Sequence, residues 1–110
     1  MFDLRRYERV AFYCRLQLTV LPNGPVVPGN SFDISIGGAG ISTSVLSQRG
    51  QQVSIRFYLR NGTRQEVHAD VLGQVANCRS DETSNRIGVA FLAEIREAAQ
   101  PVLARKINSL

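Results

Sequence analysis

Apolar and polar residues alternate with a period of two along most of this chain, up to about residue 92. In the segment 10–20 every second residue is apolar: Val10, Phe12, Cys14, Leu16, Leu18 and Val20. Successive side chains of a strand point to opposite faces, so this pattern predicts a long strand with one buried face. The same alternation predicts further half-buried strands at 53–59, 67–75 and 87–91.

Turn-forming residues mark the expected ends of these strands. The segment 21–30, LPNGPVVPGN, contains three prolines and two glycines, which predict a turn or an edge excursion rather than a central strand. Strand character returns at 31–36 and, after two glycines, at 39–44. The Asn-Gly pair at 61–62 is a strong hairpin signal. The polar run 77–86 predicts an exposed loop.

Only the C-terminal segment has helical spacing. Its apolar residues recur at intervals that place them on one helix face: Ala98, Val102, Leu103 and Ile107. Pro101 is tolerated in such a helix if it lies in the first turn. We predict a helix over residues 96–109, which either covers one mouth of the fold or mediates association.

Several short antiparallel strands in so small a chain leave unpaired edges, and closing the sheet into a barrel removes them. We therefore predict a mainly β fold, a small antiparallel six-stranded β-barrel over residues 10–93 with one C-terminal α-helix. An arginine-rich N-terminal segment, residues 1–9, is expected to be flexible. The chain has 110 residues and is predicted to form a single domain, residues 1–110.

Charge and composition narrow the partners only a little. The formal net charge is +4 and the pI is about 9.7, which favours an anionic partner. No apolar run approaches the roughly 20 residues that span a bilayer, and charges interrupt the N-terminus where a secretory signal is apolar. We therefore expect a cytoplasmic protein without a membrane span. Cys14 and Cys78 are expected to be reduced thiols, with Cys14 in the core.

Two short clusters carry residues suited to ligand binding. Near the N-terminus lie three arginines: Arg5, Arg6 and Arg9. Arginine offers a planar, permanently charged fork for phosphate and for guanine edges. The stretch FDISIGG places the carboxylate of Asp33 and the hydroxyl of Ser35 on one face of an extended strand, before Gly37 and Gly38. Together the clusters offer cations for phosphate and an acceptor for purine ring N–H groups.

Each cluster also has a purely structural interpretation. The arginines alone describe a solvated basic N-terminus with no specific partner. Asp33 and Ser35 before glycines are ordinary turn chemistry. Gly37, Gly38 and Gly40 then serve only to allow positive φ or a sharp bend.

The order and spacing of the clusters favour the ligand. R-x-x-x-R from Arg5 to Arg9, followed by D-x-S-x-x-G at Asp33, Ser35 and Gly38, resembles the two-part signature of PilZ domains. Members of that family with both parts are bacterial receptors for cyclic di-GMP. The resemblance implies that this dinucleotide is the ligand and that no cofactor or metal is needed. It also implies signalling to an unidentified partner protein in motility, biofilm or pilus control.

The resemblance assigns roles to the N-terminal cluster. It implies that Arg5 and Arg9 clamp phosphates and guanine edges, that Arg6 adds charge, and that Leu4 lies near the ligand and influences whether one or two molecules bind. The segment is then expected to fold over the barrel when the dinucleotide arrives, which exposes a changed surface to the partner.

The second cluster receives complementary roles. By resemblance, Asp33 accepts from a guanine N–H group, Ser35 hydrogen-bonds nearby, and Gly38 lets the backbone approach the ligand closely; Gly37 beside it is also expected to be a ligand-binding residue. The strand containing Gly88-Val89-Ala90-Phe91 lies where relatives have their last strand before a helix. Asn77 departs from the pattern, because relatives often have an aromatic residue there, and it is a possible further ligand contact.

Other functions have weaker support in the sequence. His68 is the only histidine and lies on a polar strand face, so neither a catalytic group nor a metal site is predicted. A small basic barrel that binds single-stranded nucleic acid is one alternative, but only Tyr13 and Tyr58 are expected to face outward as stacking platforms, since Phe12 and Phe57 lie on apolar faces. A PilZ-like adaptor that binds only protein is the other.

Overall fold

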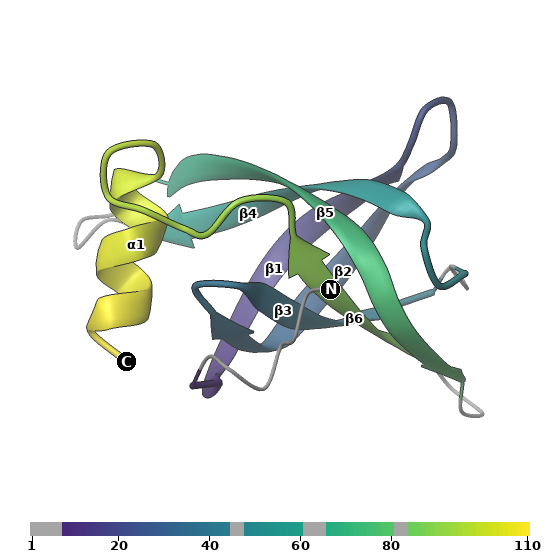
Figure 1. Cartoon of the computed structure of the whole chain (residues 1–110), viewed down its shortest axis with the longest axis horizontal. Helices are drawn as coiled ribbons and strands as arrows, with labels where there is room; N and C mark the ends of the chain where they lie inside the picture. Colours follow the sequence, from purple (N-terminus) through teal and green to yellow (C-terminus); the bar gives the residue numbers. More distant parts are fainter. Residues whose placement is uncertain (1–7, 45–47, 61–65, 81–83) are drawn as a thin grey trace.

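The fold is a ring of antiparallel strands with one helix at its end (Figure 1). A computed structural model describes residues 8–44, 48–60, 66–80 and 84–110. Within these residues the elements are β1 (Val10–Val20), β2 (Val26–Ser35), β3 (Gly38–Thr43), β4 (Gln52–Arg60), β5 (Glu66–Ser80), β6 (Asn85–Phe91) and α1 (Pro101–Asn108). The strands close in the order β1-β2-β3-β6-β5-β4. The predicted barrel of six strands with a C-terminal helix is confirmed.

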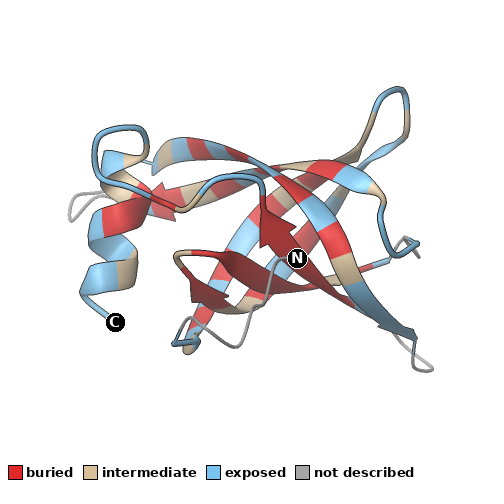
Figure 2. Cartoon of the chain, in the orientation of Figure 1, coloured by how far each residue is buried: buried red, intermediate tan, exposed pale blue. Residues whose placement is uncertain are grey.

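The inside of the barrel is filled by the apolar faces that the alternation predicted (Figure 2). Leu16 and Leu18 on β1 are fully buried, as are Ile55 and Phe57 on β4. Leu16 lies opposite Phe57 and Leu18 opposite Ile55, so the β1–β4 pairing that closes the ring brings these side chains together. Their polar neighbours face outward, as a strand with one buried face requires. Cys14 is also buried, as expected.

The helix α1 covers one end of the barrel (Figure 1). Leu103 and Ala104 are buried in the same core as the strands. The helix begins at Pro101, five residues later than the predicted start at 96, and ends at Asn108. Proline has no N–H for an interior helical bond, so it fits at the first position and not in the second turn. The residues before it form a separate turn, in which the N–H of Gln100 donates to the carbonyl of Arg96 at 2.8 Å.

β2 begins earlier than expected. The predicted turn or edge excursion at 21–30 is wrong for its second half, because β2 starts at Val26 and includes Pro28. The pairing of β2 with β3 ends at Gly29, opposite Thr43. Pro28 therefore lies beyond the end of β3, where its missing N–H breaks no ladder with that strand.

The β5–β6 hairpin extends beyond the filled barrel. The predicted loop at 77–86 is wrong for residues 77–80, which belong to β5, and for Asn85 and Arg86, which belong to β6. All four residues 77–80 are exposed. Alternation is visible only where one face of a strand is buried, and this part of the hairpin has none, so its sequence resembles a loop.

The β4–β5 hairpin agrees with the Asn-Gly signal at 61–62. β4 and β5 pair without interruption up to Arg60 opposite Glu66. The turn residues themselves lie outside the described part of the chain.

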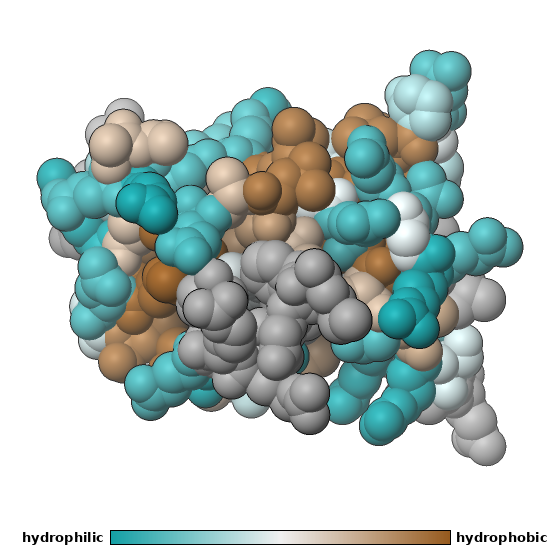
Figure 3. Space-filling view, viewed as in Figure 1, coloured by the Kyte–Doolittle hydropathy of each residue, from teal (hydrophilic) through white to brown (hydrophobic). Residues whose placement is uncertain are grey.

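Most of the surface in Figure 3 is hydrophilic, with an apolar area on the face shown. Exposed apolar side chains include Leu72 and Leu92, whose main chains are joined by a 3.0 Å hydrogen bond.

Three register shifts interrupt the described sheet: one lies in β1 between Ala11 and Cys14, opposite β2, and the other two change which side chains face outward near the candidate site. Between Ser31 and Asp33, β2 has one residue more than β3, and the extra residue is Phe32. Such a bulge breaks the alternation, so Phe32 and its neighbour Asp33 are both partly exposed. The other shift near the site lies in β5 between Val75 and Asn77, opposite β6. Both bulges border the candidate site.

Candidate functional site

Arg9, the described member of the N-terminal cluster, meets Asp33 of the second cluster on the outer surface of the barrel. Arg9 precedes β1, and Asp33 lies next to the bulge in β2. The guanidinium Nη1 of Arg9 is 3.8 Å from Oδ2 of Asp33, and the two side chains are 32% and 25% exposed. The other carboxylate oxygen, Oδ1, accepts the N–H of Gly40 at 2.8 Å. One oxygen of Asp33 is thus fixed by the sheet, while the other faces a cation.

Ser35 is the last residue of β2, Gly37 lies in the turn that follows, and Gly38 begins β3. Ser35 and Asp33 are in unbroken register two residues apart, so they share a face of the sheet, as predicted. The hydroxyl of Ser35 accepts the N–H of Gly37 at 3.1 Å and lies 3.4 Å from the carbonyl of Gly38, to which it donates. Ser35 is only 1% exposed. The structure therefore places this hydroxyl inside the turn and not at the open surface.

Positive φ does not account for these glycines. Among the described glycines, only Gly50 has a positive φ, of 90°. Gly37 and Gly38 are buried instead, and the carbonyl of Gly37 accepts the N–H of Phe91 at 2.9 Å. The turn is therefore held against the end of β6.

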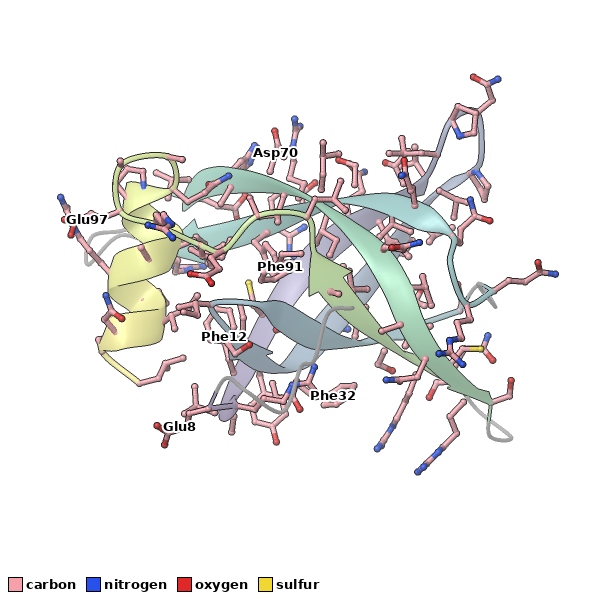
Figure 4. All side chains as sticks on the ribbon, in the orientation of Figure 1. Glu8, Phe12, Phe32, Asp70, Phe91 and Glu97 are labelled. Atoms are coloured by element: carbon pink, nitrogen blue, oxygen red, sulfur yellow. The ribbon has the colours of Figure 1, made fainter. Side chains whose placement is uncertain are left out.

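A cavity of about 310 Å³ lies beside Arg9. It is also lined by Phe32, by Gly40 and Gly88, and by residues of the β5–β6 hairpin that include Asn77. Its volume is at the lower end of the range for ligand pockets. Figure 4 shows Phe12 and Phe91 inside the barrel and Phe32 outside it.

Two glycines form the floor of this cavity. Asp33, Gly40, Gly88 and Asn77 lie opposite one another in turn, on β2, β3, β6 and β5. A Cβ at Gly40 would lie 2.4 Å from the ring of Phe32 and 2.7 Å from Oδ1 of Asp33. A Cβ at Gly88 would lie 2.7 Å from the side-chain amide of Asn77. The glycines thus leave room for these three side chains to lie flat across the sheet.

The site carries net positive charge. Arg9, Arg79 and Arg86 line the cavity, and Asp33 pairs with Arg9. Three cations and one carboxylate give a formal charge of +2 among these described residues. Such a site is suited to an anion with two charges.

A larger hollow, of about 550 Å³, lies elsewhere, between the end of β1 and the start of β4. Its lining includes one charged residue, Arg49, with Pro22 and several glutamines. The described residues that line it include neither an aromatic side chain nor a carboxylate. The smaller cavity therefore offers more charged and aromatic side chains for ligand binding, although its volume is smaller.

The sequence prediction identified part of this site. Arg9, Asp33 and Asn77 lie at or beside the cavity. Leu4, Arg5 and Arg6 lie outside the described residues. The prediction missed the other seven lining residues: Phe32, Gly40, Cys78, Arg79, Arg86, Ile87 and Gly88. Strict alternation places Phe32 in the core, and the polar run around the two arginines was predicted to be a loop, so neither gave a usable signal.

The described residues contain neither a metal-ligand cluster nor a membrane-spanning helix. Among the described residues, no three histidine, cysteine or acidic side chains are grouped so that they could hold a metal ion. In the same part of the chain, no helix has both the length and the apolar character to cross a bilayer.

Comparison with protein families gives a clear result. The family model described as the PilZ domain matches residues 3–109. The chain belongs to the PilZ domain family. The resemblance inferred from the two short motifs is thereby confirmed over almost the whole length. No curated protein matches this PilZ domain by sequence search.

Solved structures agree on the fold. The Bacillus subtilis inhibitor of motility (MotI/DgrA) superposes with a TM-score of 0.73 at 15% identity, covering 98% of this chain and 52% of that one. The PilZ domain of YcgR from Escherichia coli, solved with c-di-GMP, gives a TM-score of 0.70 at 21% identity and covers 98% of this chain and 92% of that one. The PilZ domain of CeSA from a cellulose-synthesizing bacterium gives 0.67 at 16% identity and covers 93% and 96%. This PilZ domain thus spans about half the length of the Bacillus subtilis protein, and at these identities the likeness is one of fold.

Proposed function

We propose that this PilZ domain is a receptor for cyclic di-GMP, which it binds at the cavity beside Arg9 and Asp33. The observation that carries the proposal is the meeting of these two residues, which are far apart in the sequence, at the edge of a cavity with net positive charge. The dinucleotide has two phosphate charges, which match the formal +2 of the site. The likeness to the YcgR PilZ domain, solved with c-di-GMP, supports the same ligand.

Asp33 and Arg9 have distinct roles in this proposal. The N–H of Gly40 fixes Oδ1 of Asp33, which leaves Oδ2 to accept from a guanine N–H group. The contact between Arg9 and Asp33 is long, at 3.8 Å, and both side chains are partly exposed. Such a pair is weak, so a ligand displaces it at little cost. Arg9 then turns to a phosphate or a guanine edge, where a bidentate contact is stronger.

The remaining predicted residues enter the proposal in two ways. Arg5, Arg6 and Leu4 belong to the matched family region and are proposed to approach the ligand with Arg9. The turn of Ser35, Gly37 and Gly38 holds the strand end that carries Asp33. A direct contact of Ser35 with the dinucleotide requires its hydroxyl to exchange its partners within the turn.

The output of the receptor is proposed to be a change of surface that a partner protein recognises. Ordering of the arginine segment over the cavity is the simplest such change. Control of motility, biofilm formation or pili is the expected process, and a relative of the same fold is an inhibitor of motility. The cytoplasmic location and the absence of catalysis stay predictions.

Calorimetric titration with cyclic di-GMP tests the proposal. Arg9→Ala and Asp33→Ala should each lose roughly 1–3 kcal/mol, or about 5- to 150-fold in affinity. Asp70→Ala removes an exposed carboxylate from β5 outside the cavity and should bind like the parent. If Arg5→Ala, Arg9→Ala and Asp33→Ala all bind like the parent, the proposal is wrong. Salt-dependent binding to oligonucleotides without a response to the dinucleotide would instead favour the nucleic-acid module.

A further inference from the structure

The β5–β6 hairpin places two arginines directly opposite each other beside the cavity. Arg79 on β5 pairs in register with Arg86 on β6, and both line the cavity. No carboxylate among the residues that the structure describes forms an ion pair with either of them. Like charges directly opposite on neighbouring strands are destabilising. An anionic ligand between them offsets that repulsion.

One of these arginines is already oriented by an aromatic ring. The guanidinium of Arg86 lies 5.4 Å from the ring centroid of Phe32. The ring of Phe32 in turn covers the main chain of Gly40, which has no Cβ to displace it. Glycine backbone, ring and guanidinium therefore form three layers. Arg86 is exposed, so the outer face of its guanidinium plane is available for stacking.

These two arginines lie across the cavity floor from Arg9 and Asp33. The row from Asp33 through Gly40 and Gly88 to Asn77 crosses four strands, which is roughly 14 Å at the usual strand spacing. Arg79 and Arg86 lie two residues beyond Asn77 and Gly88 along the hairpin. A ligand that is bound at Arg9 and Asp33 and has a second base and a second phosphate can extend toward them.

We propose that Arg79, Arg86 and Phe32 form a second binding arm of the cavity, here called the hairpin arm. One guanine of the dinucleotide stacks on Arg86, and the adjacent phosphate pairs with Arg79. This inference rests on the proposed function, because it assigns the second half of the same ligand. In this arrangement Phe32 does not contact the base itself; its ring lies against the guanidinium of Arg86, on which the base stacks.

Affinity measurements on arginine variants test the hairpin arm. Arg79→Ala and Arg86→Ala should each bind cyclic di-GMP at least about fivefold more weakly than the parent. Arg86→Lys keeps the charge but loses the planar stack, so it should bind nearly as weakly as Arg86→Ala. Arg60→Ala removes another exposed strand arginine, outside the cavity, and should leave affinity unchanged. Thermal melting of each variant checks that the fold is retained.

A cysteine in the same cavity gives an independent readout. Cys78 is exposed and lines the cavity near Arg79. Cys14 is buried, and burial raises the pKa of its thiol, so it should react far more slowly with iodoacetamide. Saturating cyclic di-GMP should slow the alkylation of Cys78 in the parent. In Arg86→Ala at matched saturation, this protection should be reduced.

The outcomes separate this inference from the proposed function. One set of results would contradict the hairpin arm alone. In it, Asp33→Ala loses binding, whereas Arg79→Ala and Arg86→Ala bind like the parent and the ligand does not protect Cys78. The proposal that the domain is a cyclic di-GMP receptor would then still hold. If the parent itself does not bind the dinucleotide, the proposed receptor function and the proposed hairpin arm are both wrong. Weaker binding of both arginine variants together with protection of Cys78 supports the arm.

Discussion

The barrel presents arginines on two faces, and their surroundings differ. On the face formed by β1, β4 and the first half of β5, Arg56 donates to the two carboxylate oxygens of Asp70 at 2.7 and 3.1 Å. Arg15 donates to Glu66 at 3.0 Å and lies 4.3 Å from the ring centroid of Tyr58. We call this the paired face.

The cavity face, formed by β2, β3, β6 and the second half of β5, pairs Arg9 loosely with Asp33 but leaves two other arginines opposed to each other. Arg79 and Arg86 face each other, and no carboxylate among the described residues pairs with them. Two glycines lie between these arginines and Asp33. Figure 4 shows Phe32 of this face and Asp70 of the paired face on opposite sides of the molecule.

The comparison shows that residue type alone does not identify a binding surface. On the paired face, Arg15 and Arg56 are neutralised by carboxylates of the protein itself. On the cavity face, Arg79 and Arg86 have no such carboxylate among the described residues. Tyr58, which the nucleic-acid alternative needs as an open platform, is covered by Arg15 on one side and contacted edge-on by His68 at 4.8 Å.

The largest expected effect comes from filling the glycine floor. Gly40→Ala places a Cβ against the ring of Phe32 and Oδ1 of Asp33, so both side chains must move. Losing the charge-assisted contact of Asp33 with the ligand should weaken cyclic di-GMP binding by about 10- to 150-fold in calorimetry. The clash involves only the ends of side chains, so the free energy of unfolding should change by about 1 kcal/mol or less.

Gly73→Ala is the matched control for the floor. Its Cβ would lie 2.4 Å from a methyl group of Val89 and 3.0 Å from the carbonyl oxygen of Ala90. This overpacking should cost roughly 1–3 kcal/mol of stability in denaturant unfolding. The affinity of the folded protein should stay the same. If Gly40→Ala also lost stability without losing affinity, the floor would be structural only.

Replacing one arginine by glutamate should have opposite effects on stability on the two faces. Arg79→Glu replaces the opposed arginines with an oppositely charged pair, so it should raise the free energy of unfolding by roughly 0.2–1 kcal/mol while it weakens ligand binding. Arg15→Glu places a second carboxylate beside Glu66 and removes the contact with Tyr58, so it should lower stability and leave binding unchanged.

Urea unfolding and calorimetry on the two glutamate variants measure these signs. Opposite changes of stability support the distinction between the faces. A loss of stability in Arg79→Glu equal to that in Arg15→Glu would show that the hairpin arginines are also structural, and would remove the distinction.

The smallest expected effect is a pH dependence on the paired face. The hydrogen bonds from Arg56 hold the pKa of Asp70 below its usual value. A carboxyl group with a lowered folded-state pKa stabilises the protein fully above its unfolded pKa, near 3.9, and this stabilisation is lost as pH falls through the lower folded-state pKa. The parent should therefore exceed Asp70→Asn in stability by a small amount at pH 6, and the difference should vanish in strong acid.

Acid titration of melting temperature for the parent and Asp70→Asn checks this point. Because both partners are exposed, added salt should reduce the difference at pH 6. A difference that grows in acid would contradict the assignment of the pKa shift to Arg56.

Much of the fold was predictable because a strand with one buried face requires apolar and polar residues to alternate along the sequence. Leu16, Ile55 and Phe57 alternate with polar residues, and each is buried as predicted. Pro101 limited where the helix begins, although the predicted start was too early. The exposed part of β5 at 77–80 was missed because neither of its faces is buried.

The candidate site was only partly predictable. Arg9 and Asp33 were found because their residue types and spacing match a family motif, and the structure brings them to 3.8 Å. Phe32 was missed because one extra residue in β2 turns it outward. This bulge depends on the pairing of β2 with β3, and the sequence of β2 alone does not indicate it.

Local periodicity and motif spacing thus identified the strand faces, the family and the first two ligand-binding candidates. The closure of the ring through β1 and β4, the two bulges and the placement of Arg79 and Arg86 beside the glycine floor depend on pairing between distant segments. Side-chain alternation repeats every two residues along one strand, and it contains no information on which strand lies alongside or in what register. Long-range pairing therefore determines which polar residues of the outer surface come together as a site.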